Sequence, residues 1–432
     1  MSRLSEHMRT LILNAGEIAH MSSGDVNLPL VGSQMGDIVA NIHPPGMGIV
    51  IESGIITGIS ESEELATEFS PSWKSGNGVF DGISIFDADF RAIVPGFVDS
   101  HTHLLWGGDR SNEIKLRQSG MSYAQISDAG GGINKTVKET RRCTIQDLVS
   151  MGKQRLSEAE NLGTTTIEVK SGYGLSAESE LRLLEACGII SEHSRMDVHT
   201  TWLGAHDFPK EKSNSEYMDE LISEQLPLVA EQGLANWVDV FCEPGWYNLE
   251  QTEAIVVAAK GLGLSPRLHV DEFVDSGGLA LASELGSVSA DHVAHSNDSS
   301  REEASKTGTM QTFLPGTPYV IGSNEYPPIK KCMENDWAFS LATDFNPNCN
   351  SLSIPFVGSL AAHRCGIDPI SSLAAVTRNP ATTLGYADKP RVGSISVGMD
   401  ANLNILKSSA VEMWCQTPGM NPISSTFVKG LL

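Results

Sequence analysis

The chain has 432 residues, of which 53 are acidic and 30 basic, giving a formal net charge of −23, and 40% are hydrophobic. This length and composition predict a folded protein with a large core, built either as one large barrel with an accessory module or as two domains. The acidity argues against nucleic acid and anionic membrane surfaces as partners, because both attract basic patches.

The first ninety residues contain short β-type segments separated by turns. Residues 48–59 hold two β-branched runs on either side of Ser53-Gly54, a pattern that predicts a hairpin. Residues 393–406 form a similar β-rich piece near the other end. These two ends predict one small β-sandwich assembled from both terminal segments. The polar, acidic stretch 60–77 predicts an exposed loop.

The middle of the chain alternates between strand-like and helix-like segments. Helices are expected at 145–160 and 177–191, and strands at 163–170, 198–203, 237–242, 267–270 and 339–343. The alternation predicts an α/β fold with a TIM-like (β/α)8 barrel. A doubly wound open sheet is the alternative, but no GxGxxG motif opens a helix after a strand. The predicted division is 1–94 and 387–432 for the two parts of the β-sandwich, and 95–386 for the barrel.

Two histidines at the end of the first barrel strand are the main chemical signal. The apolar pair Phe97-Val98 is followed by His101 and His103. Side chains two residues apart in an extended strand point to the same side, so both imidazoles can reach one metal ion. The carboxyl end of a barrel strand is where such enzymes place their chemistry.

Further ligand types follow later strands. His269 comes after an apolar leucine with Glu272 three residues on, and Asp344 ends another strand. Three imidazoles and a carboxylate leave an open position for water on zinc or a comparable metal. Such a metal lowers the pKa of water from about 15.7 toward about 7. Taken singly, His269 or Asp344 is more readily structural than a ligand, but together and in this order the four residues indicate a metal site.

This arrangement resembles the amidohydrolase superfamily of metal-dependent barrels, and within it the imidazolonepropionases. The similarity covers roughly residues 94–385. It rests on HTHL at 101–104, GDR at 108–110, GGGI at 130–133, EVKSGYG at 168–174, LGAH at 203–206, HVDEF at 269–273, ADH at 290–292 and DFNP at 344–347.

The resemblance implies a hydrolase of histidine degradation, which opens 4-imidazolone-5-propanoate to N-formimidoyl-L-glutamate with one Zn²⁺ or Fe³⁺ per subunit. Carried over by position, the metal ligands are His101, His103, His269 and Asp344, and the substrate contacts are Arg110, Tyr173, His206, Glu272, Asn346 and Asn348. Lys170 matches a lysine that bridges two metals in many relatives, but single-metal imidazolonepropionases also have it. We therefore expect one ion, with Lys170 either behind the metal ligands or in an ion pair.

The catalytic hypothesis gives separate roles to Glu272, His292 and Asp344. Glu272 holds a ring N–H or orients the attacking water, His292 donates to the developing oxyanion, and Asp344 passes a proton to the leaving nitrogen. The guanidinium of Arg110 suits a substrate carboxylate, and the hydroxyl of Tyr173 adds a donor.

Several of these residues have structural alternatives. Arg110 could pair with Asp109 or Glu113, Tyr173 could be a packing aromatic, and His206 could cap a loop. Asn348 and Cys349 depart from the glycine and serine or threonine that many bacterial members carry, which weakens their assignment as direct ligands.

Two rival functions stand beside the hydrolase. One is an amidohydrolase that deaminates an aromatic ring, which Arg110 with Tyr173 disfavours because they suit a carboxylate. The other is an inactive barrel scaffold, which has no need of four metal ligands. The seven scattered cysteines include no CxxC and suit a reducing compartment. With no signal peptide or apolar span in view, we expect a cytoplasmic enzyme, compatible with a homodimer, that acts on a small molecule.

Overall fold

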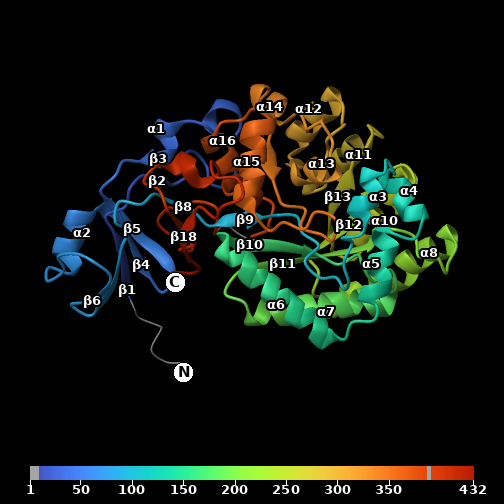
Figure 1. Cartoon of the computed structure of the whole chain (residues 1–432), viewed down its shortest axis with the longest axis horizontal. Coiled ribbons are helices and arrows are strands. Elements are labelled where there is room, and N and C mark those ends of the chain that lie inside the picture. Colours follow the sequence, from blue (N-terminus) through green and yellow to red (C-terminus); the bar gives the residue numbers. More distant parts are fainter. Residues whose placement is uncertain (1–8, 387–390) are drawn as a thin grey trace.

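The computed structural model describes residues 9–386 and 391–432, and its centre is an eight-stranded parallel sheet (Figure 1). The sheet runs in the order β16-β15-β14-β13-β12-β11-β10-β9. Between its two edge strands, Thr102 bridges Phe345 and the amide of His103 donates to the carbonyl of Phe345 at 2.8 Å. The sheet therefore curls into a nearly closed barrel, and the predicted TIM-like α/β fold is confirmed.

The barrel strands are buried on both faces, as parallel strands covered by helices must be. Every residue of β10 is buried, including its threonines, Glu168 and Lys170. The strands are β9 (Phe97–Asp99), β10 (Thr164–Lys170), β11 (Asp197–Ala205), β12 (Trp237–Cys242), β13 (Ser265–Val270), β14 (Ser289–His292), β15 (Met310–Phe313) and β16 (Phe339–Leu341).

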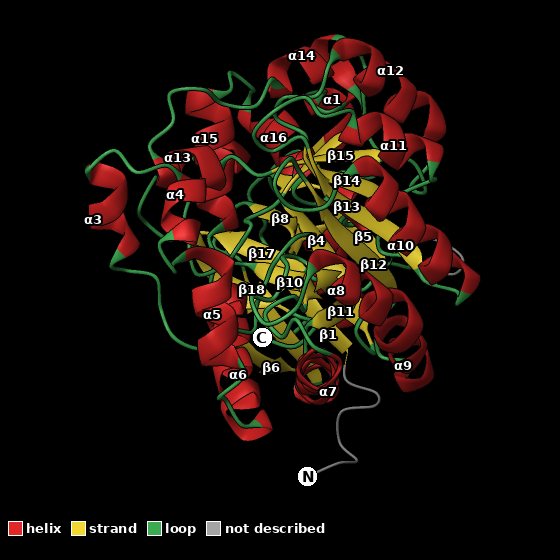
Figure 2. Cartoon of the chain, turned by 90° about the vertical axis from the view of Figure 1, so that its right-hand side faces the viewer, coloured by secondary structure: helices red, strands yellow, loops and turns green. Residues whose placement is uncertain are grey.

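Helices surround these strands, and Figure 2 shows them in red around the yellow sheet. One of the two longest, α6, begins at a clear signal, a capping box of Thr144 and Asp147. The helices of this region are α3 (Glu113–Gln118), α4 (Tyr123–Asp128), α5 (Gly132–Thr140), α6 (Ile145–Asn161), α7 (Ala177–His193), α8 (Asn214–Glu220), α9 (Leu226–Gln232), α10 (Leu249–Gly261), α11 (Gly278–Glu284), α12 (Asp298–Thr307), α13 (Gly316–Ile321), α14 (Ile329–Glu334), α15 (Ile354–Arg364), α16 (Pro369–Ala375) and α17 (Arg378–Ala381).

Two five-stranded sheets beside the barrel combine both ends of the chain (Figure 1). Their orders are β5-β4-β1-β7-β6 and β18-β17-β8-β2-β3. The two sheets share an apolar cluster that includes Ile12, Ile49, Ile93, Leu403 and Phe427. The strands are β1 (Arg9–Leu13), β2 (Ile18–Ala19), β3 (Ile42–His43), β4 (Met47–Glu52), β5 (Ile55–Glu61), β6 (Gly78–Phe80), β7 (Ile83–Asp87), β8 (Ile93–Pro95), β17 (Leu403–Leu406) and β18 (Ile423–Phe427).

The expected small sheets from both terminal segments are thus present, and the hairpin at 48–59 is confirmed as β4 and β5. Its turn uses left-handed backbone at Ser53 and Gly54, with φ of 50° and 81°. The domain boundaries after residues 94 and 386 stay a prediction, and the second adjoins residues 387–390, which lie outside the described residues.

Other local expectations were wrong. The stretch 60–77 is not all loop, because it holds α2 (Ser62–Phe69), which buries Leu65 against Leu11 and Val50. A short helix α1 (Ile38–Asn41) also precedes β3. In the piece 393–406 only β17 is a strand, and its hairpin partner is β18 rather than the preceding residues.

Two further observations concern the chain as a whole. All seven cysteines fall within the described ranges and are free thiols. Over those same ranges, no helix is long and apolar enough to cross a membrane.

Candidate metal centre and substrate cavity

The four predicted metal ligands meet at the carboxyl ends of three strands. His101 and His103 follow β9, His269 lies in β13 and Asp344 follows β16. Nε2 of His103 lies 3.3 Å from Nε2 of His269 and 3.7 Å from Oδ1 of Asp344, which is 3.6 Å from Nε2 of His101. Ligand atoms on a tetrahedral zinc with bonds of 2.0–2.1 Å are about 3.3 Å apart. The donor set therefore has the spacing that a metal ion needs.

Two buried carboxylates lie behind these imidazoles. Oδ2 of Asp291 lies 2.6 Å from Nδ1 of His101, and Oδ2 of Asp239 lies 2.9 Å from Nδ1 of His269. A carboxylate on one ring nitrogen directs the lone pair of the other nitrogen outward, as in many metal sites. Nε2 of His101 is fully buried and finds no hydrogen-bond partner in the described chain. Such an atom is costly unless something binds it, so the residues fit a metal.

The electrostatics of the cluster keep its imidazoles neutral, the form that binds metal. Burial lowers the pKa of His269 to about 3 and, with Lys170 adding to the effect, holds that of His101 well below its usual value. Burial likewise lowers the pKa of His103, and it lowers the pKa of the neighbouring His206 to about 3.

Lys170 lies beneath the cluster, in a group of buried carboxylates. Its Nζ is 2.8 Å from Oδ2 of Asp239, 2.9 Å from Oε1 of Glu168 and 3.6 Å from Oδ2 of Asp291. Burial alone would lower the pKa of Lys170, but the three carboxylates outweigh it and raise that pKa. The expected ion-pairing position of Lys170 matches this geometry.

The three predicted catalytic groups face one another across the same space. Nε2 of His292, at the end of β14, lies 3.6 Å from Oε2 of Glu272. Burial and the nearby carboxylates of Asp344 and Glu243 raise the pKa of Glu272 well above its usual value. Burial also raises the pKa of Asp344 to about 7, although it accepts a hydrogen bond of 2.6 Å from Oγ1 of Thr317. These groups can exchange protons with a ligand held between them.

The predicted substrate contacts line one inner cavity of about 50 Å³ together with four of the ligand and catalytic residues. The six contacts are Arg110, Tyr173, His206, Glu272, Asn346 and Asn348. The structure thus brings all of them to the candidate metal centre, although they come from five separate loops.

Arg110 and Asn346, like Asn348, already form hydrogen bonds with other protein groups. Nε of Arg110 donates to Oε2 of Glu113 at 2.9 Å, the pairing weighed above as an alternative, but the pair is buried rather than on the surface. Oδ1 of Asn346 accepts from the amides of Asn348 and Cys349, so it shapes its loop.

The two aromatic substrate contacts, His206 and Tyr173, lie close to the metal position. Nδ1 of His206 lies 3.0 Å from the carbonyl oxygen of Gly172, and its ring stacks on His103 with centroids 4.9 Å apart. Tyr173 is buried, with its ring centroid 5.8 Å from that of His103. Gly172 has a φ of +105°, which lets the chain turn tightly beneath them.

Sequence reasoning missed several residues of this site. Asp239, Asp291 and Glu168 carried a signal, because each is a charged residue inside a buried strand. Glu243, whose Oε1 accepts from the amide of Glu272, lies in a loop, and Thr317 lies in the first turn of α13; neither carried such a signal.

Comparisons with known proteins agree with this geometry. A sequence model of the amidohydrolase family matches residues 229–432. The imidazolonepropionase of Symbiobacterium thermophilum is 38% identical over 404 residues, covering 92% of this chain and 91% of that protein. The imidazolonepropionase of Shewanella sediminis is 41% identical over 317 residues, covering 72% and 76%.

Solved structures with the same fold are more distant in sequence. A zinc-bound adenosine deaminase from Xanthomonas campestris superposes with a TM-score of 0.66 at 17% identity, covering 98% of this chain and 92% of that one. Guanine deaminase from E. coli superposes with a TM-score of 0.66 at 15% identity, covering 99% of each chain. At these identities they bear on the fold alone.

Proposed function

The chain belongs to the imidazolonepropionase family of amidohydrolases, and from that premise we propose that it hydrolyses 4-imidazolone-5-propanoate to N-formimidoyl-L-glutamate in histidine degradation. Water adds to the ring amide carbonyl, the C–N bond breaks, and the ring nitrogen gains a proton. The observation that carries the proposal is that three of the candidate metal ligands and all six candidate substrate contacts line one cavity, with the fourth ligand, His101, grouped with those ligands.

The family is metal-dependent, and His101, His103, His269 and Asp344 would hold one ion here, Zn²⁺ or Fe³⁺. When bound, the ion lowers the pKa of a water molecule from about 15.7 toward about 7 and polarises the carbonyl. A single ion is favoured because Nζ of Lys170 is surrounded by three carboxylates and so is poorly placed to become a bridging ligand.

The protein groups then act on the substrate and its protons. Glu272 orients the attacking water or holds a ring N–H, and His292 donates a hydrogen bond to the oxygen on which negative charge develops. Asp344 carries the proton to the leaving nitrogen. The Arg110 guanidinium, fixed by Glu113, and the Tyr173 hydroxyl bind the propanoate tail. Burial excludes bulk water and strengthens each of these interactions.

The test is ultraviolet-monitored loss of freshly prepared 4-imidazolone-5-propanoate by protein that has been stripped with a chelator and then restored with zinc or iron. We expect metal-dependent loss well above spontaneous decay, with N-formimidoyl-L-glutamate accumulating. A folded, metal-loaded protein that gives no acceleration would refute the proposal, and purines would then be the next substrates to assay. The homodimer stays a prediction, which light scattering on the same sample addresses.

A further inference from the structure

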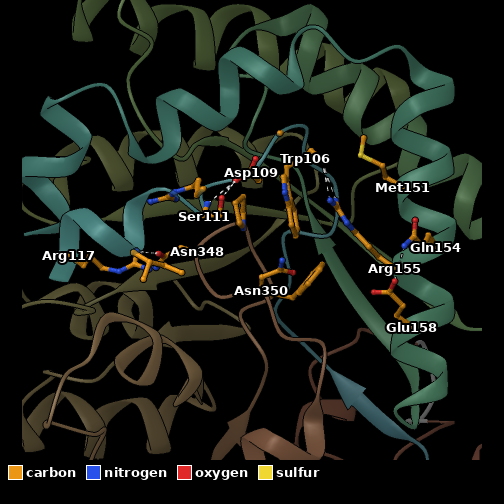
Figure 3. Close-up of a pocket in the computed structure, with 15 residues that line it drawn as sticks. Trp106, Asp109, Ser111, Arg117, Met151, Gln154, Arg155, Glu158, Asn348 and Asn350 are labelled. Carbon is orange, nitrogen blue, oxygen red and sulfur yellow. Dashed lines mark hydrogen bonds between the residues drawn. The ribbon is translucent and has the colours of Figure 1, made fainter. Parts of the chain in front are cut away.

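A second, larger cavity adjoins the inner one. It has a volume of about 420 Å³ (Figure 3), and Arg110 and Asn348 line both cavities. Ligand pockets usually measure about 300–1,000 Å³, so the inner cavity at about 50 Å³ is too small for a substrate as it stands. The outer cavity has the capacity that the inner one lacks.

Three guanidinium groups line the outer cavity, in a chain whose net charge is −23. Arg110 is neutralised by the buried carboxylate of Glu113. Arg155 donates to the carbonyl of Leu104 at 2.6 Å and lies over the Trp106 ring, 3.6 Å from its centroid. Arg155 is therefore committed to the protein itself, and Arg110, which also lines the inner cavity, is the group proposed to bind the substrate tail there.

The third guanidinium, Arg117, differs in its partner. Nη1 of Arg117, near the end of α3, donates to Oδ1 of Asn348 at 2.5 Å. Among the side chains that the structure describes, none pairs its carboxylate with this half-buried guanidinium. A carboxylate is a stronger acceptor for a guanidinium than a neutral amide, so an anion can compete for this position.

The acidic residues that line the same cavity, Asp109 and Glu158, form hydrogen bonds with groups other than Arg117. Oδ1 of Asp109 accepts from the amide of Ser111. Oε1 of Glu158 accepts from Nε2 of Gln154 at 2.9 Å. Figure 3 shows Arg117 and Asn348 together at one end, with Gln154 and Glu158 at the opposite end and Trp106 between them.

We infer that the outer cavity is a second binding site for a planar heterocycle that carries a carboxylate, with the carboxylate on Arg117 and the ring against Trp106 and Phe345. The two aromatic rings lie with centroids 4.8 Å apart and form one wall of the cavity. This inference rests on the proposed function, whose substrate has such a ring and tail. The site holds that substrate before it enters the inner cavity.

The contact with Asn348 explains how occupancy would affect entry. A carboxylate on Arg117 replaces Oδ1 of Asn348, and this frees a side chain that forms part of the wall between the cavities. Of the two residues that line both cavities, Asn348 then loses its hydrogen bond, while Arg110 stays paired with Glu113. Asn348 is thus the movable part of the wall.

Calorimetric titration of the metal-loaded full chain with 3-(imidazol-4-yl)propanoate tests the site without any turnover. This probe has a planar ring and the tail, but no amide carbonyl to hydrolyse. We expect two sites in the parent and one in Arg117→Gln. Asn348→Asp should also lose the outer site, because the new carboxylate pairs with Arg117 and competes with the probe. Arg142→Gln, which changes a guanidinium that is 64% exposed, should keep both sites.

The same number of sites in Arg117→Gln, Asn348→Asp and the parent would overturn the inference. Hydrolysis gives a separate readout: Arg117→Gln should raise KM about tenfold, the effect of losing one charge-assisted hydrogen bond, with the change on KM rather than kcat. Hydrolysis by the parent with an unaltered KM in Arg117→Gln would overturn the outer site but leave the proposed function. A parent that does not hydrolyse the imidazolone refutes the proposed function and with it the holding role.

Discussion

Nζ of Lys170 lies 2.8 Å from Oδ2 of Asp239, and both side chains are fully buried. The same carboxylate oxygen lies 2.9 Å from Nδ1 of His269. Asp291 forms a parallel link, because its Oδ2 is 3.6 Å from Lys170 and 2.6 Å from Nδ1 of His101. One ammonium group thus holds the two carboxylates that orient two of the proposed metal ligands.

Removing this cation should destabilise the protein. In Lys170→Met, the carboxylates of Glu168, Asp239 and Asp291 remain buried without their shared counter-charge. Breaking a buried pair by deleting one partner costs about 3–5 kcal/mol. Urea unfolding followed by circular dichroism measures the loss. Lys306→Met is the matched control, because its pair with Glu302 is exposed and should change the free energy of unfolding by less than about 1 kcal/mol. Equal unfolding midpoints for Lys170→Met and the parent would contradict the expectation.

Asp239→Asn should weaken metal binding while keeping the shape of the site. The variant removes the charged acceptor beside Nδ1 of His269, and loss of such a partner typically lowers metal affinity about 10–100-fold. Metal content after equilibration with a graded series of chelators, read by mass spectrometry, gives the affinity. Asp219→Asn on the exposed face of α8 should match the parent. If Asp239→Asn keeps the parent's affinity, His269 is oriented by other contacts or is not a ligand.

Glu272→Gln should impair turnover without emptying the metal site. The amide keeps the size of the side chain but lacks the carboxylate that orients the attacking water or holds a ring N–H, and loss of such a group in acid–base chemistry costs about 10²–10⁴-fold in kcat. Steady-state hydrolysis and metal content, measured on the same sample, separate the two effects. Glu284→Gln, at the exposed end of α11, serves as the control. Intact turnover with reduced metal occupancy would show that Glu272 supports the metal instead.

The barrel was predictable because strands and helices space their hydrophobic residues differently along the sequence. Strand-like and helix-like segments alternate in this way over the whole middle of the chain. β14 and β15 were missed because they are four residues long, and β14 carries Asp291 and His292, which do not read as strand formers. The helix α2 was missed because only one of its large apolar residues, Leu65, is fully buried and its surroundings are acidic.

The candidate site was predictable where a residue follows a strand, since the carboxyl ends of parallel strands meet at one edge. His101, His103, His269 and Asp344 all satisfy that rule. Contacts between distant loops were not predictable in this way. Arg117 and Asn348 are 231 positions apart, and nothing near either residue in the sequence indicates the other. The pair exists because α3 and the loop after β16 fold over the same cavity.

A histidine far from the metal centre predicts how stability depends on pH. The ring of His199, in β11, lies 5.8 Å from the ring of Trp237 and 5.7 Å from that of Tyr386, centroid to centroid. Burial lowers the pKa of His199 to about 4 from 6.5; the charge of Asp197 partly opposes this shift, and that of Arg267 adds to it.

Because the folded pKa is the lower one, the unfolded chain binds a proton between pH 6.5 and 4 that the folded chain does not. The free energy of unfolding therefore falls as the pH drops through this window, by about 2 kcal/mol after discounting for partial solvent access. His199→Gln should show a shallower loss between pH 7 and pH 4.5 in urea unfolding. It should not abolish the loss, because burial also lowers the pKa of His20 to about 4. The exposed His193, changed to Gln, should follow the parent, and an identical slope in His199→Gln and the parent would refute the assignment to His199.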